Sequence, residues 1–276
     1  MSTNSKIIFL DLDGTLYDDD KHVSVENRRA LNEALAAGHK VAITTGRPLP
    51  SALRLADELQ LNGDGCYIIA YNGGLSYDPY RKKLMSITGI PLSRVVELMH
   101  RANDFGLHAQ TYSDTSVVSE FENEDLHRYC KKTKMPFEIV SDVTEALGSD
   151  YTPCKALVIC YESHEKLDAF KADVTSWCEG TLEMVYSCPE YLEFMPAGVN
   201  KGHAVRMLAK ELGIPMENTV AAGDAENDIE MLNTAHVGAL MCNALESMKG
   251  VGNYVTTRDN NHDGVAEIID RFLLNK

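Results

Sequence analysis

The chain has 276 residues, of which 44% are hydrophobic and 24% charged, and its formal net charge is −15. This length supports one large domain or two modest ones, each with a proper core. The acidic surface repels nucleic acid and anionic lipid, so neither is expected as a partner. An anionic substrate would need a metal ion or a few placed cations to be bound.

The cysteine pattern and the hydropathy indicate the compartment. The cysteines number seven, which is odd, and no two form a C-x-x-C pair, so buried free thiols are expected rather than disulfides or zinc. Ile7–Leu10 is too short an apolar run for a signal peptide. No run approaches the ~18 apolar residues of a membrane span. The sequence predicts a cytoplasmic protein without a membrane segment or an evident obligate protein partner.

The first 81 residues alternate short apolar strands with amphipathic helices. Strands are expected at 6–10, 40–44 and 67–70, and helices at 25–37 and 50–59. Ser24 is a suitable N-cap for the first helix and Gly38 a suitable stop. The βαβαβ order predicts right-handed crossovers and a doubly wound parallel α/β sheet, a Rossmann-like arrangement.

The middle of the chain has a different pattern, and the α/β rhythm returns after it. Strands are expected at 112–118, 137–140, 155–161, 183–187 and 191–195, with helices at 92–105 and 164–178. Later helices are expected at 201–212, 228–234 and 264–274, and strands at 219–222 and 236–240. We therefore predict an α/β core of residues 1–81 and 199–276, with an inserted α+β domain of residues 82–198.

Two pairs of carboxylates follow short apolar strands. Asp11 and Asp13 come directly after the first strand, and Asp224 and Asp228 follow the strand at 219–222. The carboxyl ends of parallel strands form the ligand-binding edge of α/β folds. Clustered carboxylates are costly without a cation, which indicates bound Mg²⁺. For the first pair the simpler alternative is a solvated acidic turn, as expected for Asp18–Asp20. For the second pair, helix capping alone would explain one of the two acids.

Two further residues suit an anion. Thr45 ends the second strand, where its hydroxyl and nearby backbone N–H groups can hold a phosphate oxygen. Lys201 begins a helix and supplies the positive charge that an acidic protein needs at such a site. Taken singly, each has an ordinary structural or solvated explanation.

Together these motifs resemble a known family. The patterns D-x-D-G-T at 11–15, T-G-R at 45–47, K-G at 201–202 and G-D-x-x-N-D at 223–228 occur in this order. They resemble the four motifs of the haloacid dehalogenase (HAD) superfamily of phosphohydrolases. The long insertion after the second motif, with Asn72-Gly73-Gly74 before it, resembles the Cof-type branch (type IIB) with a C2 cap. The resemblance spans the whole chain.

The resemblance implies a mechanism. Asp11 would attack phosphorus and form an aspartyl-phosphate. Asp13 would protonate the leaving oxygen and later deprotonate the hydrolytic water. Thr45 and Lys201 would neutralise charge on the phosphoryl oxygens.

The resemblance also implies the ligands. Mg²⁺ would be held by the Asp11 carboxylate, the Asp13 carbonyl, Asp224 and, directly or through water, Asp228, with Asn227 orienting these ligands. The substrate-binding residues would be Gly46, Arg47, Asn72 and Asn200. The expected substrate is a small phosphorylated metabolite, with sugar phosphates as the class, and the cap would set specificity.

Two alternatives remain. A sugar phosphomutase of the same superfamily shares the Asp pair and a large cap. A non-enzymatic receiver-like protein shares a phospho-accepting Asp, a Thr and a Lys, but has no reason to carry an acid at Asp13 or an insertion at 82–198. The acid at this position also argues against ATPase members, which carry Thr there. No G-x-x-x-x-G-K-[ST] loop supports nucleotide-driven chemistry.

Overall fold

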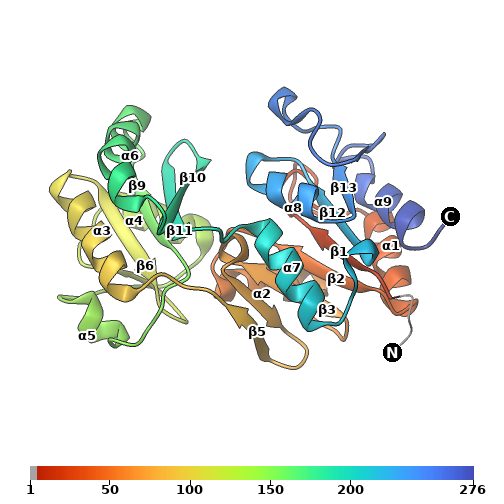
Figure 1. The fold of residues 1–276 in the computed structure, drawn as a ribbon, viewed down its shortest axis with the longest axis horizontal. Coiled ribbons are helices and arrows are strands. Elements are labelled where there is room, and N and C mark those ends of the chain that lie inside the picture. The colour runs from red at the N-terminus through yellow and green to blue at the C-terminus, as the bar shows by residue number, and fades with distance from the viewer. Residues whose placement is uncertain (1–4) are drawn as a thin grey trace. The chain divides into compact units, whose positions relative to one another are not determined.

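The structure is a computed structural model that describes residues 5–276, and within it the chain forms two compact units (Figure 1). The first unit contains the described residues up to Gly46, together with Ala52–Ser86 and Asn200–Lys276. The second contains Arg47–Ser51 and Ile87–Val199. Each unit has its own sheet and its own hydrophobic core.

The sheet of the first unit has the strand order β14-β13-β12-β1-β2-β3-β4-β5. Its strands from β14 to β3 are parallel, and β4 runs antiparallel to β3. The strands are β1 (Ile7–Leu10), β2 (Lys40–Thr44), β3 (Cys66–Ala70), β4 (Leu75–Asp78), β5 (Lys83–Ile87), β12 (Thr219–Gly223), β13 (Val237–Leu240) and β14 (Tyr254–Val255). The strand β1 is completely buried between two parallel neighbours, as its continuous apolar sequence predicts.

Helices cover both faces of this sheet. They are α1 (Val25–Ala36), α2 (Leu49–Leu59), α7 (Lys201–Glu211), α8 (Ile229–Thr234) and α9 (Gly264–Phe272). Short 3₁₀ turns span Tyr71–Gly73, Met216–Asn218, Glu226–Asp228 and Glu246–Met248. On one face, α7 and α8 pack against the side chains of Ile7 and Phe9. The helices α1 and α9 lie side by side, joined by the bond from the Ala266 N–H to Asn27 Oδ1 at 2.8 Å.

The second unit is an α+β fold with the strand order β10-β11-β9-β6-β7-β8. Its strands are β6 (His108–Tyr112), β7 (Val117–Ser119), β8 (Phe137–Ile139), β9 (Ala156–Ile159), β10 (Leu182–Cys188) and β11 (Tyr191–Pro196). Its helices are α3 (Leu92–Asp104), α4 (Glu124–Thr133), α5 (Val143–Leu147) and α6 (His164–Cys178). Buried side chains of α3, α5 and α6 pack on one face of the sheet, with Phe170 at the centre. The predicted fold class is therefore confirmed: an α/β core with an α+β insertion.

One local prediction in the middle of the chain was wrong. The strand expected at 112–118 is a tight turn between the end of β6 and the start of β7, with the Ser113 N–H donating to the Ser116 carbonyl at 2.9 Å. Elsewhere, the basic run Arg81-Lys82-Lys83 leads into β5 at the edge of the first sheet. Arg81 is held there by Asp64 at 2.8 Å and Asp78 at 3.0 Å.

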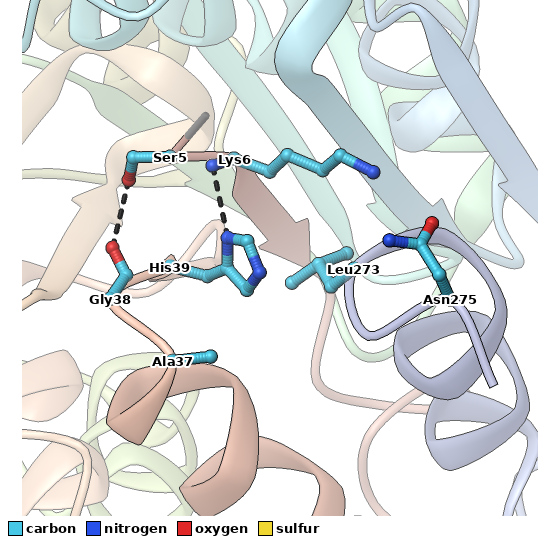
Figure 2. A pocket seen from close by; sticks show the side chains of 7 residues that line it. All are labelled: Ser5, Lys6, Ala37, Gly38, His39, Leu273 and Asn275. Atoms are coloured by element: carbon cyan, nitrogen blue, oxygen red, sulfur yellow. Dashed lines mark hydrogen bonds between the residues drawn. The ribbon is translucent and has the colours of Figure 1, made fainter. Parts of the chain in front are cut away.

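A pocket lies at the amino end of β1, opposite the edge where the predicted motifs lie (Figure 2). The Lys6 N–H donates to His39 Nδ1 at 3.1 Å, and the Ser5 hydroxyl donates to the Gly38 carbonyl at 2.8 Å. None of the side chains that line it is a carboxylate. It has no groups for the predicted chemistry, which must be sought at the other end of the strands.

Among residues 5–276, no helix is both long enough and apolar enough to cross a membrane.

The core of the second unit can be tested through Phe170. This ring is fully buried and makes edge contacts with Phe105 and Phe194 at centroid distances of 5.5 and 6.4 Å. Phe170→Ala leaves a cavity and should lower the free energy of unfolding by about 3–5 kcal/mol. Trp177 in α6 is the single tryptophan of the chain, so its fluorescence in a urea titration reports this unit.

The matched control is Phe121→Ala, since that ring in the same unit is 56% exposed. It should change the free energy of unfolding by no more than about 0.5 kcal/mol. Equal losses for the two variants would contradict the packing described for Phe170.

Candidate active site

The central strands of the first unit bring the two acidic motifs together. Asp11 directly follows β1, and its N–H donates to the Ala222 carbonyl of the neighbouring β12 at 3.0 Å. Asp224 directly follows β12, and Asp228 ends the short 3₁₀ turn after it. One carboxylate oxygen of each of Asp11, Asp224 and Asp228 lies within 4.8 Å of the other two. Three acids that are far apart in sequence therefore form one cluster at the carboxyl edge of the sheet.

Lys201 supplies the positive charge at this cluster. Its side chain is fully buried, and Nζ lies 2.5 Å from Asp11 Oδ1 and 2.6 Å from Asp228 Oδ1. It is the first residue of α7, and the Asn200 side chain caps that helix by accepting from the His203 N–H at 2.8 Å. Asn200, predicted to contact the substrate, thus makes a capping hydrogen bond that fixes the start of α7 at Lys201.

Burial dominates the electrostatics of the cluster. It raises the pKa of Asp11 to about 8, although Lys201 lowers it in part and Asp228 raises it further. Burial also raises the pKa of Asp224 to about 6, again with a contribution from Asp228. The pKa of Lys201 is lowered by burial, but the carboxylates of Asp11 and Asp228 outweigh this and raise it overall. The carboxylates are thus short of positive charge even with the lysine in place.

Asp13 lies beside this cluster rather than in it. Its side chain is 48% exposed and pairs with Lys21 Nζ at 2.8 Å. Thr15 connects the loop after β1 to the second acidic motif, because its hydroxyl donates to Asp224 Oδ1 at 3.0 Å. Gly14 has a φ of +81°, and a Cβ there would collide with the Asp224 carboxylate, so the turn requires glycine. Lys21 and Thr15 were not singled out from the sequence, although Thr15 belongs to the D-x-D-G-T motif.

Thr45, Gly46 and Asn72 form a second group at the same edge. The strands β1 and β2 are parallel, with Leu10 opposite Ile43. Thr45 directly follows β2 and therefore lies at the same edge of the sheet as Asp11, which directly follows β1. The Asn72 N–H donates to the Thr45 carbonyl at 3.1 Å. A Cβ on Gly46 would lie 2.9 Å from Asn72 Oδ1, which shows how closely the Asn72 amide covers this backbone.

The turn after β3 is held in a conformation that L-residues rarely adopt. Tyr71 and Asn72 have φ values of +52° and +53°, and Gly73 has +105°. A Cβ on Gly73 would overlap the carbonyl oxygen of Asn200. The backbone of this turn therefore touches the residue that precedes Lys201. It couples the Thr45 loop to the start of α7.

Asn227 and Arg47 complete the set of predicted site residues. Asn227 is half-buried in the 3₁₀ turn Glu226–Asp228. Arg47 belongs to the second unit.

Comparisons with known proteins show the family to which the chain belongs. The model of a family described as haloacid dehalogenase-like hydrolases matches residues 8–269, and the chain belongs to that family. The 5-amino-6-(5-phospho-D-ribitylamino)uracil phosphatase YcsE of Bacillus subtilis is 30% identical over 98% of this chain and 96% of its own. The chain is a phosphatase of the Cof-type branch, as its motifs indicated.

Solved structures support the same fold. A haloacid dehalogenase-like hydrolase from Bacteroides thetaiotaomicron is 31% identical and superposes with a TM-score of 0.84, covering 97% of this chain and 99% of the other. The HAD subclass IIB sugar phosphatase BT4131 is 23% identical with a TM-score of 0.79, over 97% of this chain and 99% of its own. The second likeness concerns the fold alone.

The contact between Gly73 and Asn200 can be tested by substitution. Gly73→Ala should destabilise the protein more than a positive φ alone explains, because the new Cβ meets backbone that cannot rotate away. The matched control is Gly213→Ala, which has a φ of +65° and no heavy atom within 4 Å of the new Cβ. We expect a loss of about 1–2 kcal/mol for the control and a larger loss for Gly73→Ala, measured by chemical denaturation. Equal losses would show that the close approach has no energetic weight.

Proposed function

We propose that this phosphatase is a Mg²⁺-dependent phosphomonoesterase of small phosphorylated metabolites, with sugar phosphates as the substrate class and Asp11 as the nucleophile. The observation that carries the proposal is the cluster of Asp11, Asp224 and Asp228 around Lys201. A buried carboxylate that pairs with a buried lysine at a strand end suits in-line attack on phosphorus.

The donor set fits Mg²⁺. The ion takes oxygen ligands at about 2.1 Å, so opposite ligands lie roughly 4 Å apart, and the three carboxylates lie within 4.8 Å of one another. Asp11, Asp224 and Asp228 would hold the ion with the Asp13 carbonyl, and Asn227 would orient them. When bound, the ion supplies positive charge that offsets the carboxylates and the phosphoryl oxygens.

The chain's own residues would perform the transfer. The Asp11 carboxylate attacks phosphorus, the bond to the leaving oxygen breaks, and an aspartyl-phosphate forms. Asp13 gives its proton to the leaving oxygen, then takes one from the water that hydrolyses the intermediate. Lys201 and Thr45 neutralise charge on the transferred group. Substrate contacts are proposed for Gly46, Arg47, Asn72 and Asn200.

The substrate class rests on the relatives. A phosphoribityl compound is the substrate named for YcsE. That name describes a phosphate on a polyhydroxylated carbon chain. The cap would select among such leaving groups. We place the enzyme in the cytoplasm without an obligate protein partner, which accords with its free cysteines.

The direct test is phosphate release from a panel of sugar phosphates, FMN and pyridoxal phosphate, with and without Mg²⁺. We expect Mg²⁺-dependent release, and Asp11→Asn should reduce it on the order of 10⁴-fold or more, because the amide cannot act as the nucleophile. The control Asp173→Asn changes an exposed carboxylate of α6 and should be as active as the wild type. Full activity of Asp11→Asn would remove Asp11 from its role.

The metal assignment is tested separately through Asp224→Asn, which keeps the shape but removes one ligand charge. The Mg²⁺ concentration for half-maximal rate should rise at least about tenfold. Glu226→Gln is the control, since Glu226 is an exposed acid two residues away and is not part of the cluster. A wild-type Mg²⁺ titration for Asp224→Asn would contradict the assignment.

A further inference from the structure

Two asparagines from the C-terminal part of the chain hold the loop that follows β1. Asn243 lies after β13, and its Nδ2 donates to the Gly14 carbonyl at 2.8 Å. Its Oδ1 accepts from the Asn260 N–H at 3.2 Å. Both ends of the Asn243 amide are therefore used, one on the loop and one on Asn260.

Asn260 extends the same contact along the loop. It is 4% exposed, and its Nδ2 donates to the Tyr17 carbonyl at 3.0 Å and to Asp19 Oδ1 at 3.1 Å. Asp19 belongs to the acidic run that the sequence indicated as a solvated turn, and the structure shows that this residue is an attachment point. We refer to Asn243 and Asn260 together as the asparagine clamp.

The Asn243 bond acts at the glycine of this loop. Glycine has access to more backbone conformations than other residues, so a bond to its carbonyl restricts the local path of the chain. On the other side of the loop, the Thr15 hydroxyl is bonded to Asp224. Asp13 precedes Gly14 directly, and its side chain is half exposed. The direction of the Asp13 side chain thus depends on its pairing with Lys21 and on a backbone that is held at Gly14 and Thr15.

We propose that the asparagine clamp positions Asp13 for proton transfer, with Asn243 and Asn260 as positioning residues of the reaction. This inference rests on the proposed function, in which Asp13 protonates the leaving oxygen. Neither asparagine would touch the reacting atoms. They act through the Gly14 and Tyr17 carbonyls.

The role predicts a dependence on the leaving group. When the phosphorus–oxygen bond breaks, the oxygen keeps the electron pair. A sugar alkoxide must receive a proton at that moment, whereas p-nitrophenolate is stable as an anion and leaves without one. A misplaced Asp13 should therefore slow cleavage of a sugar phosphate much more than cleavage of p-nitrophenyl phosphate. A merely structural defect would lower both rates equally.

The experiment compares kcat/KM for the sugar phosphate with kcat/KM for p-nitrophenyl phosphate. For each ester, kcat/KM reports the steps up to and including the first phosphoryl transfer, in which the leaving group departs. Asn243→Asp replaces the donor by an oxygen that faces the Gly14 carbonyl, and Asn243→Ala removes both bonds. For both variants we expect a loss on the order of 10- to 100-fold with the sugar phosphate and less than about threefold with p-nitrophenyl phosphate.

Asn253→Asp is the matched control. Its amide also bridges two backbone groups, the His236 carbonyl at 2.8 Å and the Gly238 N–H at 3.1 Å, but it makes no bond to the loop. It should lower kcat/KM equally for the two esters, if at all.

Two results would overturn the inference: equal losses on both esters for the Asn243 variants, or no loss on either. Both are distinct from failure of the proposed function, which would appear as a wild-type enzyme without phosphatase activity.

A double variant adds a second readout. In an Asp13→Asn background, Asn243→Ala should have no further effect on the sugar phosphate, because the residue through which it acts is already gone. Additive losses would contradict the role.

Discussion

The contact of Lys201 with Asp11 and Asp228 is the constraint on which the site depends. A fully buried ammonium group is stable only with charged partners, and removing one partner of such a group typically costs about 3–5 kcal/mol. The lysine lies at the first position of α7, Asp11 at the end of β1, and Asp228 in the turn after β12. Through two ion pairs, one lysine therefore ties a helix start to the two central strands.

The surrounding backbone is shaped to keep this contact. The Asn200 side chain determines where α7 begins, and the turn at Gly73 touches the Asn200 carbonyl. On the opposite side, Gly14 brings the loop after β1 against Asp224. Glycine is needed at both places because another chain segment occupies the space of a side chain. At each place the glycine backbone lies directly against its neighbour, the Asp224 carboxylate or the Asn200 carbonyl.

Much of this arrangement could be predicted from the sequence. The strand at 40–44 and the helix at 164–178 have the predicted bounds, because each is a continuous pattern with clear ends. The four motifs were found because their residue types and order are specific. The acids and Lys201 that the structure brings together were all among the predicted site residues.

The parts that could not be predicted depend on contacts between distant segments. The bond from Asn243 to Gly14 spans 229 positions, and no local pattern reports it. The positive φ values of Tyr71 and Asn72 are equally hidden, since neither residue type requires them. The helix α4, with the N-cap Asn123, is absent from the predicted helices, because its many charges obscure a short apolar stripe formed by Leu126, Tyr129 and Cys130.

The position of β1 between β2 and β12 has a consequence for synthesis on the ribosome. The strand is made among the first residues of the chain, but its second neighbour begins only at Thr219. Nearly all of the second unit, residues 87–199, emerges before that point and can fold as a domain in advance. Until then one flank of the most apolar strand has no partner. The acids Asp224 and Asp228 emerge just after this neighbour begins, so the acidic cluster is completed only as the central sheet closes.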